Sequence, residues 1–396
     1  MHDFQKIISA MTKQKFSARL AAKIISAGRD WRRFLPLGLA CGLPQLLRAE
    51  NHVDYRYEFY REANDRMTIE THSVYFEQKL ADAVTAKGEF IYDGISGATP
   101  VGTHNLAGKA LTTHVEDTRR AGNVGLDWKF AQHTLSPGFA YSEESDYTSS
   151  GISLGDAIEF NDKNTILQLG AAHNFDRVRH ADRTTWSDKD STDVIVGISQ
   201  LLSPTTVANV AFTFGYDDGF LNDPYRLAEY HPDIFPAGFN IGVNEHRPGY
   251  RSREILFLSL THYFDKLNAS LEGSYRFHHD SYDVSSHTLG LTWHQRLGNH
   301  FIIEPMFRFY EQSAASFYTT TFSGGYSTDP AGLHSSDYRL SEFYSIDYGL
   351  QATVIINDHL RLVGGYHRYE MRGLDGTDAA MYPQANIFTV GVTILW

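Results

Sequence analysis

Acidic residues gather in the segment 217–224 (DDGFLNDP) of this chain. Asp217, Asp218 and Asp223 supply the oxygen ligands that a hard cation such as Ca²⁺ prefers. The segment lacks the ligand spacing and terminal glutamate of an EF-hand, so a polar turn that satisfies its own backbone is the alternative interpretation. The polar turn is the favoured interpretation.

Imidazoles form a second candidate group. His278 and His279 are followed by Asp280 and His287, and imidazole nitrogens are the ligands that Zn and Cu favour. The chain has 19 histidines in all, and many are scattered over other segments. Histidine also serves as an amphipathic residue at the rim of a membrane barrel, which is the alternative interpretation of this pair.

Ser285 and His287 are two residues apart, so on a strand they project to the same face. A serine hydroxyl beside an imidazole can begin a nucleophilic site, but such sites need a third group that orients the imidazole. The sequence offers no specific third member. It also has no phosphate-binding loop, dinucleotide fingerprint, EF-hand or HExxH motif. We therefore predict neither an enzyme nor a cofactor, and a hydrolase at a barrel rim is the less favoured alternative.

The first 49 residues differ from the rest of the chain. They hold nine basic residues against two acidic ones, and an apolar run at 34–47 ends in Leu47-Arg48-Ala49. This layout is typical of a secretory signal, so we expect a leader over 1–49 and a mature domain over 50–396. Removing the leader would change the formal charge from −12 to −19, which argues against a nucleic-acid partner. The single cysteine, Cys41, lies in the leader.

From residue 52 onward, strand-length segments alternate in polarity and are separated by Gly, Asn, Asp and Pro. Apolar-out, polar-in alternation over about ten residues is typical of transmembrane barrel strands. No stretch of 18 uncharged apolar residues is present, which excludes membrane-spanning helices. The pattern predicts strands at 53–61, 67–79, 84–93, 118–130, 133–143, 149–160, 164–176, 192–202, 206–216, 251–264, 267–277, 284–297, 300–312, 339–356, 359–369 and 386–396.

The connections fall into two populations. Seven are short turns, and they alternate with eight longer or more polar segments at 62–66, 94–118, 143–148, 177–191, 217–250, 278–283, 313–338 and 370–385. Short periplasmic turns and longer external loops are the asymmetry expected of outer-membrane barrels. We therefore predict an all-β, antiparallel, up-and-down barrel of sixteen strands with both termini in the periplasm, fourteen being the alternative count.

The last segment alternates most cleanly. Phe388, Val390, Val392, Ile394 and Trp396 share one face, and an aromatic carboxy-terminal residue is what the barrel-assembly machinery recognises in such proteins. We expect Phe388 and Trp396 to act as the assembly signal, and the strand to pair with the first one.

The inward faces of the predicted strands carry charges of both signs. A sixteen-stranded barrel is too wide for side chains alone to fill, so these residues line either a channel or a lumen plugged by loops. They constrict a pore for polar solutes or, as the alternative, brace the barrel wall through salt bridges. The candidates are Asp127, Lys129, Glu272, Arg276, Glu304, Arg308, Tyr310 and Asp347.

Several stretches together resemble an uncharacterised family of proteobacterial outer-membrane β-barrels that carry a domain of unknown function. They are YDGISGATP at 92–100, EDTRR at 116–120, SEESDYTSSGISLG at 142–155, GFLNDPYRL at 219–227, SHTLGL at 286–291, RFYEQSAASFY at 308–318 and SSDYRLS at 335–341. The resemblance implies the fold and the outer membrane of a Gram-negative bacterium, but no activity and no site residues. It also implies a link to thioredoxin-like or flavin-linked envelope proteins, beside which relatives are often encoded.

These observations favour a porin-like channel for small polar solutes, in contact with outer-membrane lipid. A non-conducting barrel that scaffolds or docks a partner of an envelope redox or maturation system is the alternative.

Overall fold

Residues 51–105, 108–180, 184–236, 238–325 and 332–396 are described in the computed structural model of the chain. The predicted leader over 1–49, with Cys41, lies outside these ranges. None of the helices in the described ranges is long and apolar enough to cross a membrane.

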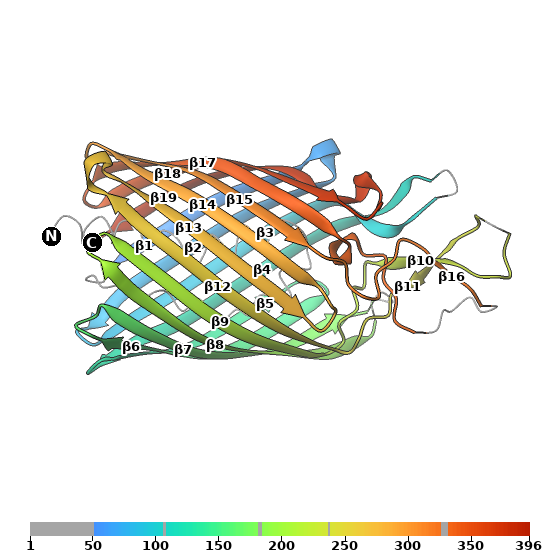
Figure 1. The fold of residues 1–396 in the computed structure, drawn as a ribbon, viewed down its shortest axis with the longest axis horizontal. Helices are drawn as coiled ribbons and strands as arrows, with labels where there is room; N and C mark the ends of the chain where they lie inside the picture. The colour runs from blue at the N-terminus through green and yellow to red at the C-terminus, as the bar shows by residue number, and fades with distance from the viewer. Residues whose placement is uncertain (1–50, 106–107, 181–183, 237, 326–331) are drawn as a thin grey trace.

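Sixteen strands close into one antiparallel barrel (Figure 1), which confirms the predicted fold and strand count. Along the chain these strands are β1 (His52–Glu62), β2 (Met67–Ala81), β3 (Val84–His104), β4 (Ala110–Phe130), β5 (His133–Glu143), β6 (Tyr147–Phe160), β7 (Thr165–Arg179), β8 (Trp186–Ser203), β9 (Thr206–Gly219), β12 (Tyr250–Phe264), β13 (Ala269–Asp280), β14 (Ser285–Leu297), β15 (Phe301–Gln312), β17 (Phe343–Asn357), β18 (Leu360–Gly373) and β19 (Gln384–Leu395).

The first and last strands seal the barrel. β1 pairs with β19 along its whole length, from His52 opposite Leu395 to Glu62 opposite Ala385. Beyond the last paired residue, the backbone N–H of Trp396 donates to the carbonyl of Asn51 at 3.0 Å. The predicted closing strand is therefore the sixteenth strand of the barrel, and neither β1 nor β19 leaves an open edge.

The outer surface of the wall is apolar because the strands alternate as the sequence predicts. On β4, Val124, Leu126 and Trp128 point outward and are 56%, 44% and 53% exposed. On β19, Val390 is 55% exposed, whereas its neighbour in the sequence, Gly391, is buried. Every strand of the barrel has at least one large apolar side chain exposed in this way. This belt is the surface that a transmembrane barrel presents to lipid.

The two ends of the barrel differ. At the end that holds the carboxy terminus, neighbouring strands are joined by short turns, several of which use a left-handed residue such as Ala131 or Asn268. The other end, which we call the loop end, carries the long connections. Two of them, 220–249 and 313–342, are named here the first and second mouth loops.

The prediction of a loop over 94–118 is wrong, because β3 and β4 continue as a hairpin to His104 and Ala110. Glycine, Pro100 and polar residues suggested irregular chain, but the ladder continues as far as Pro100 opposite Thr112 and resumes after an irregularity at His104. The first mouth loop packs against this extension, since a side chain at Gly102 would meet the carbonyl oxygen of Leu227. Tertiary packing therefore stabilises a strand that local composition disfavours.

A small sheet links the two mouth loops at the loop end (Figure 1). β10 (Leu227–His231) and β11 (Ile241–Asn244) form a hairpin in the first loop, and β16 (Phe322–Ser323) of the second loop pairs in parallel with β10. Four short 3₁₀ turns complete the described elements: η2 (Ala63–Asp65), η3 (Asp265–Leu267), η4 (Tyr338–Leu340) and η5 (Ala379–Met381).

The outward belt gives a direct test of the membrane orientation of the strands. We expect Val390→Arg to lower the free energy of unfolding by about 2–4 kcal/mol, because it places a charge in the hydrocarbon region. Val390→Leu is the matched control and should change it little. Urea unfolding in lipid vesicles measures both, and equal stability of the two variants would contradict the placement of β19 against lipid.

Candidate functional site

The predicted lumen residues all lie on the face of the wall opposite the apolar belt. Asp127 and Lys129 flank the outward Trp128, and Arg308 follows the outward Phe307. Glu272 follows the outward Leu271 in the same way. Arg276, Glu304, Tyr310 and Asp347 share the inward parity of their strands.

Several of these side chains bond to neighbours on the wall. Asp127 forms an ion pair with Lys87 at 2.5 Å, and Glu304 bonds to His294 at 2.7 Å. Asp347 lies 3.5 Å from the imidazole of His367. These contacts join adjacent strands, as the bracing interpretation requires, while leaving charged groups on the inner surface.

The mouth loops bring together a second set of charged residues, which we call the mouth network: Asp223, Arg226, Glu245, Arg247, Asp337 and Arg339. All six are at least 94% buried, from Asp337 at 1% exposed to Asp223 and Arg339 at 6%. Three positive and three negative groups balance one another. Charges this deeply buried persist only when they are paired.

Asp337 is the centre of the mouth network. Its carboxylate accepts from Arg339 Nε at 2.8 Å and from Arg247 Nη2 at 2.7 Å, so it joins the two mouth loops. Arg247 also reaches Glu245 at 2.8 Å, and Arg339 reaches Asp223 at 2.7 Å. These are charge-assisted bonds, about twice as strong as neutral ones.

Apolar packing on both sides holds η4 in place. This turn contains Arg339 of the mouth network and directly follows Asp337. Tyr338 lies in a buried apolar cluster that includes Tyr60, Phe343 and Tyr382. Members of this cluster come from strands at both ends of the sequence, β1 to β4, β15 and β17 to β19, and from the η5 segment. The next apolar residue, Leu340, packs in a separate cluster with Leu221 and Tyr282. The second mouth loop is thereby held between two parts of the loop end.

Burial shifts the proton affinities of the network, which lies outside the barrel strands. It raises the pKa of Glu245 to about 7, against the opposing effect of Arg247. It raises the pKa of Asp337 as well, against Arg226 and Arg247. It lowers the pKa of Arg339 to about 9. Desolvation is the largest cause in each case, because a low-dielectric environment disfavours the charged form.

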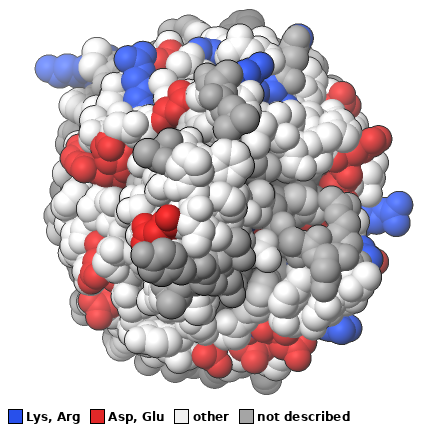
Figure 2. Space-filling model, turned by 90° about the vertical axis from the view of Figure 1, so that its right-hand side faces the viewer, with Lys and Arg blue, Asp and Glu red and all other residues white. Residues whose placement is uncertain are grey.

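Figure 2 shows the loop end in space-filling form, with charged groups mostly toward the edge of this face. The members of the mouth network lie beneath this surface, because all six are buried. The sequence did not reveal the network. The sequence did contain a signal for it. Two of the family-like stretches place an aspartate two or three residues before an arginine, as Asp223 with Arg226 and Asp337 with Arg339.

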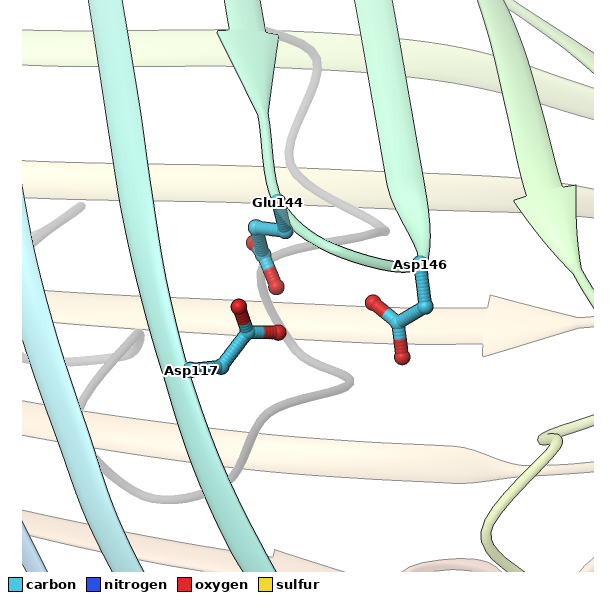
Figure 3. Close-up of side chains that lie close together, drawn as sticks. All are labelled: Asp117, Glu144 and Asp146. Atoms are coloured by element: carbon cyan, nitrogen blue, oxygen red, sulfur yellow. The ribbon is translucent and has the colours of Figure 1, made fainter. Parts of the chain in front are cut away.

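A cluster of three carboxylates lies beside the β5–β6 connection at the loop end (Figure 3). Within the described residues, Asp117, Glu144 and Asp146 are the group whose oxygens lie within 4.8 Å of one another, as a metal site would need. Asp117 accepts from Ser145 Oγ at 2.9 Å, and Asp146 accepts from the Tyr225 hydroxyl. Glu144 lies 3.8 Å from Arg119 Nε, so protein groups already hold all three carboxylates.

Asp146 and Tyr225 also line a cavity of about 240 Å³ between the first mouth loop and the β3, β4 and β7 ends. Arg179 and His180 line it from β7 and the connection that follows. The cavity is therefore polar on one side, and its volume is large enough for a small polar solute or several waters.

The structure separates the acidic residues that the sequence suggested as metal ligands. Asp217 accepts from Arg253 at 3.0 Å on the barrel wall, whereas Asp223 belongs to the mouth network. Asp218 is exposed at the end of β9. Asp223 also accepts from the backbone N–H of Tyr225 at 2.8 Å, the turn that the alternative interpretation proposed.

The histidine and serine candidates likewise have separate partners. His278 bonds to Asp280 at 3.1 Å, and His279 bonds to Ser285 Oγ at 3.0 Å. His287 instead bonds to the Tyr275 hydroxyl at 2.8 Å. Ser285 and His287 share a face, as predicted, but each uses its polar atom on another residue.

A closed antiparallel barrel with an apolar outer belt, a charged inner wall and long loops at one end defines an outer-membrane β-barrel protein. The chain belongs to the family described as protein of unknown function (DUF3570), whose model matches residues 42–187 and 178–390. This confirms the family resemblance seen in the sequence. The comparison with curated proteins found no match.

Three solved structures illustrate the similarity. One is a bacterial polysaccharide outer membrane secretin, with 11% identity, 88% of this chain and 99% of that chain covered, and a TM-score of 0.47. Another is OmpT of Vibrio cholerae, with 8% identity, coverages of 88% and 97%, and a TM-score of 0.44. The third is OccK8 (OprE) of Pseudomonas aeruginosa, with 8% identity, coverages of 88% and 98%, and a TM-score of 0.43.

The mouth network makes a prediction about loop order. Arg247→Met removes the arginine that pairs with the buried carboxylate of Glu245 and one of the arginines that pair with Asp337, so we expect closure of the mouth loops to weaken by about 3–5 kcal/mol. Hydrogen exchange of segments 220–249 and 313–342 measures this. Arg120→Met, which removes an exposed arginine from β4, is the control. Unchanged exchange in the Arg247 variant would show that apolar packing alone holds the loops.

The raised pKa of Glu245 predicts a pH dependence. A carboxyl whose pKa is higher in the closed loops takes up a proton there first, so closure is stabilised as pH falls through about 7 toward 4.5. Arg247, Asp337 and Asp223 are the charged groups that face it. We expect the protection factors of the mouth loops, which correct each exchange rate for its intrinsic pH dependence, to be higher at pH 5 than at pH 8, and this pH effect to be smaller in Glu245→Gln. An equal effect in both proteins would assign the dependence to another group.

Proposed function

We propose that this protein is a porin-like channel of the outer membrane that passes small polar solutes through a mouth narrowed by its own loops. The observation that carries the proposal is the charged inner wall. Its residues of both signs, such as Lys87, Asp127, Arg276 and Arg308, keep part of their surface accessible within the barrel. A wall of this kind interacts with polar solutes, whereas a sealed apolar core would exclude them.

The mouth loops set the size limit in this proposal. Their contacts with each other run through side chains and short strand pairings, with Asp337 at the centre. The passage is therefore narrower than the sixteen-stranded wall alone would leave. We place the termini and the short turns in the periplasm, because outer-membrane barrels carry their short turns on that side.

Phe388 and Trp396 belong to biogenesis in this proposal. Both are at least 50% exposed on the outer face, and Trp396 follows the strand that closes the barrel. They are accessible to the assembly machinery until β1 and β19 pair. Neither residue faces the inner wall, so neither contributes to the choice of solute.

A second function, docking of a partner at the loop end, is favoured by one observation. Ile234, Phe239 and Leu333 are 50%, 40% and 47% exposed in the mouth loops, outside the barrel strands. Exposed apolar side chains that form a contiguous patch mark an interaction surface. The link to thioredoxin-like or flavin-linked partners stays a prediction.

Conductance across a planar bilayer tests the channel proposal. We expect the purified, folded barrel to give unitary conductance steps, and Arg247→Met to give larger steps because its mouth loops open more readily. Arg120→Met should conduct like the unaltered protein. Well-folded protein that gives no conductance above background would refute the channel and leave docking as the function to pursue.

A further inference from the structure

Two arginines on the inner wall differ from several inward cations that are paired with carboxylates. Arg253 and Arg119 pair with carboxylates at 3.0 and 3.3 Å, and Lys87 does so at 2.5 Å. Within the described part of the chain, neither Arg276 nor Arg308 has a carboxylate oxygen within 4.0 Å. Both side chains are only partly buried, so their guanidinium charge faces the interior of the barrel.

The strand register places these two arginines in one patch. Arg276 of β13 lies opposite Thr288 of β14, which lies opposite Tyr310 of β15. Arg308 is two residues from Tyr310 on the same face, with its Cζ 5.6 Å from the centre of the tyrosine ring. Since neighbouring strands lie roughly 4.8 Å apart, the backbones of β13 and β15 are roughly 10 Å apart. Two arginine side chains reach a small solute between them.

The acidic groups of the same wall are held elsewhere. Glu272 is four residues from Arg276 along β13, roughly 13 Å toward the short turns. Glu304 is occupied by His294 and Gln351. Asp347 is in register with Arg308, but its carboxylate contacts His367. The patch of Arg276, Thr288, Arg308 and Tyr310 carries two positive charges against the single carboxylate of Asp347 beside it, so it is net positive within a wall of mixed charge.

We propose that Arg276 and Arg308 form an anion-binding subsite on the inner wall, which binds the carboxylate or phosphate group of small solutes. A guanidinium presents a planar fork of N–H donors that matches the two oxygens of such a group, and it stays charged at every physiological pH. Thr288 lies in register between Arg276 and Tyr310 and offers a hydroxyl as a further donor. The subsite deepens the proposed channel function and names its class of solute.

Ion selectivity tests the subsite in the conducting barrel. We expect the reversal potential in a KCl gradient to show a preference for anions, and the double variant Arg276→Gln, Arg308→Gln to lose it. Arg372→Gln is the matched control, because Arg372 is exposed at the loop end and pairs with Glu370 at 3.0 Å. An equal shift in the control would assign the preference to overall charge and overturn the subsite.

Binding tests the same subsite without conductance. Calorimetric titration of the detergent-folded barrel with inorganic phosphate, and separately with succinate, should give binding that the double variant weakens by about tenfold or more. The arm that binds more tightly identifies the preferred group. Arg276→Lys should weaken binding less than Arg276→Gln, because it keeps the charge and loses the fork.

The outcomes separate the two proposals. A barrel that binds phosphate or succinate through these arginines but gives no conductance keeps the subsite and refutes the channel. A barrel that conducts with no anion preference, and binds neither probe, keeps the channel and refutes the subsite. Circular dichroism of each variant confirms that the barrel is folded before either measurement.

Discussion

Every backbone N–H and C=O that enters the hydrocarbon of a membrane must find a partner within the protein, and this structure meets that demand by closing on itself. The rest of the structure depends on the hydrogen-bonded pairing of β1 with β19, because without it the edges of these two strands would face lipid. Once the ring is closed, each strand has one face toward lipid and one toward the interior. The apolar belt and the charged inner wall follow from that division.

Closure leaves the problem of the interior, which sixteen strands make too wide for wall side chains to fill. The inner wall and the loop end differ in the side chains that occupy the interior. Along the wall, ion pairs such as Lys87 with Asp127 join neighbouring strands. At the loop end, the mouth loops fill the opening with Tyr338, Leu340 and a balanced set of buried charges.

The mouth network has a physical cost that explains its composition. Desolvation opposes each buried charge, and the opposing effects on the pKa of Glu245 and Asp337 show burial outweighing the arginines beside them. Such a network adds little net stability but strongly penalises loss of a single partner. It therefore favours one arrangement of the two mouth loops relative to each other. The inner wall lacks this balance at Arg276 and Arg308, the two arginines of the proposed anion-binding subsite.

The sequence by itself determined the strands, their number and the closing role of β19, because alternation along a strand is local and the barrel repeats it sixteen times. It also determined which side of each strand holds Asp127 or Arg308. Only the tertiary structure decided what those side chains contact. Asp223 was a candidate cation ligand in the sequence, yet its carboxylate meets Arg339, 116 residues away. The β3–β4 hairpin was expected to be a loop until the first mouth loop packed against it. Contacts between distant loops leave no periodic trace in the chain, so no pattern of neighbours could have predicted them.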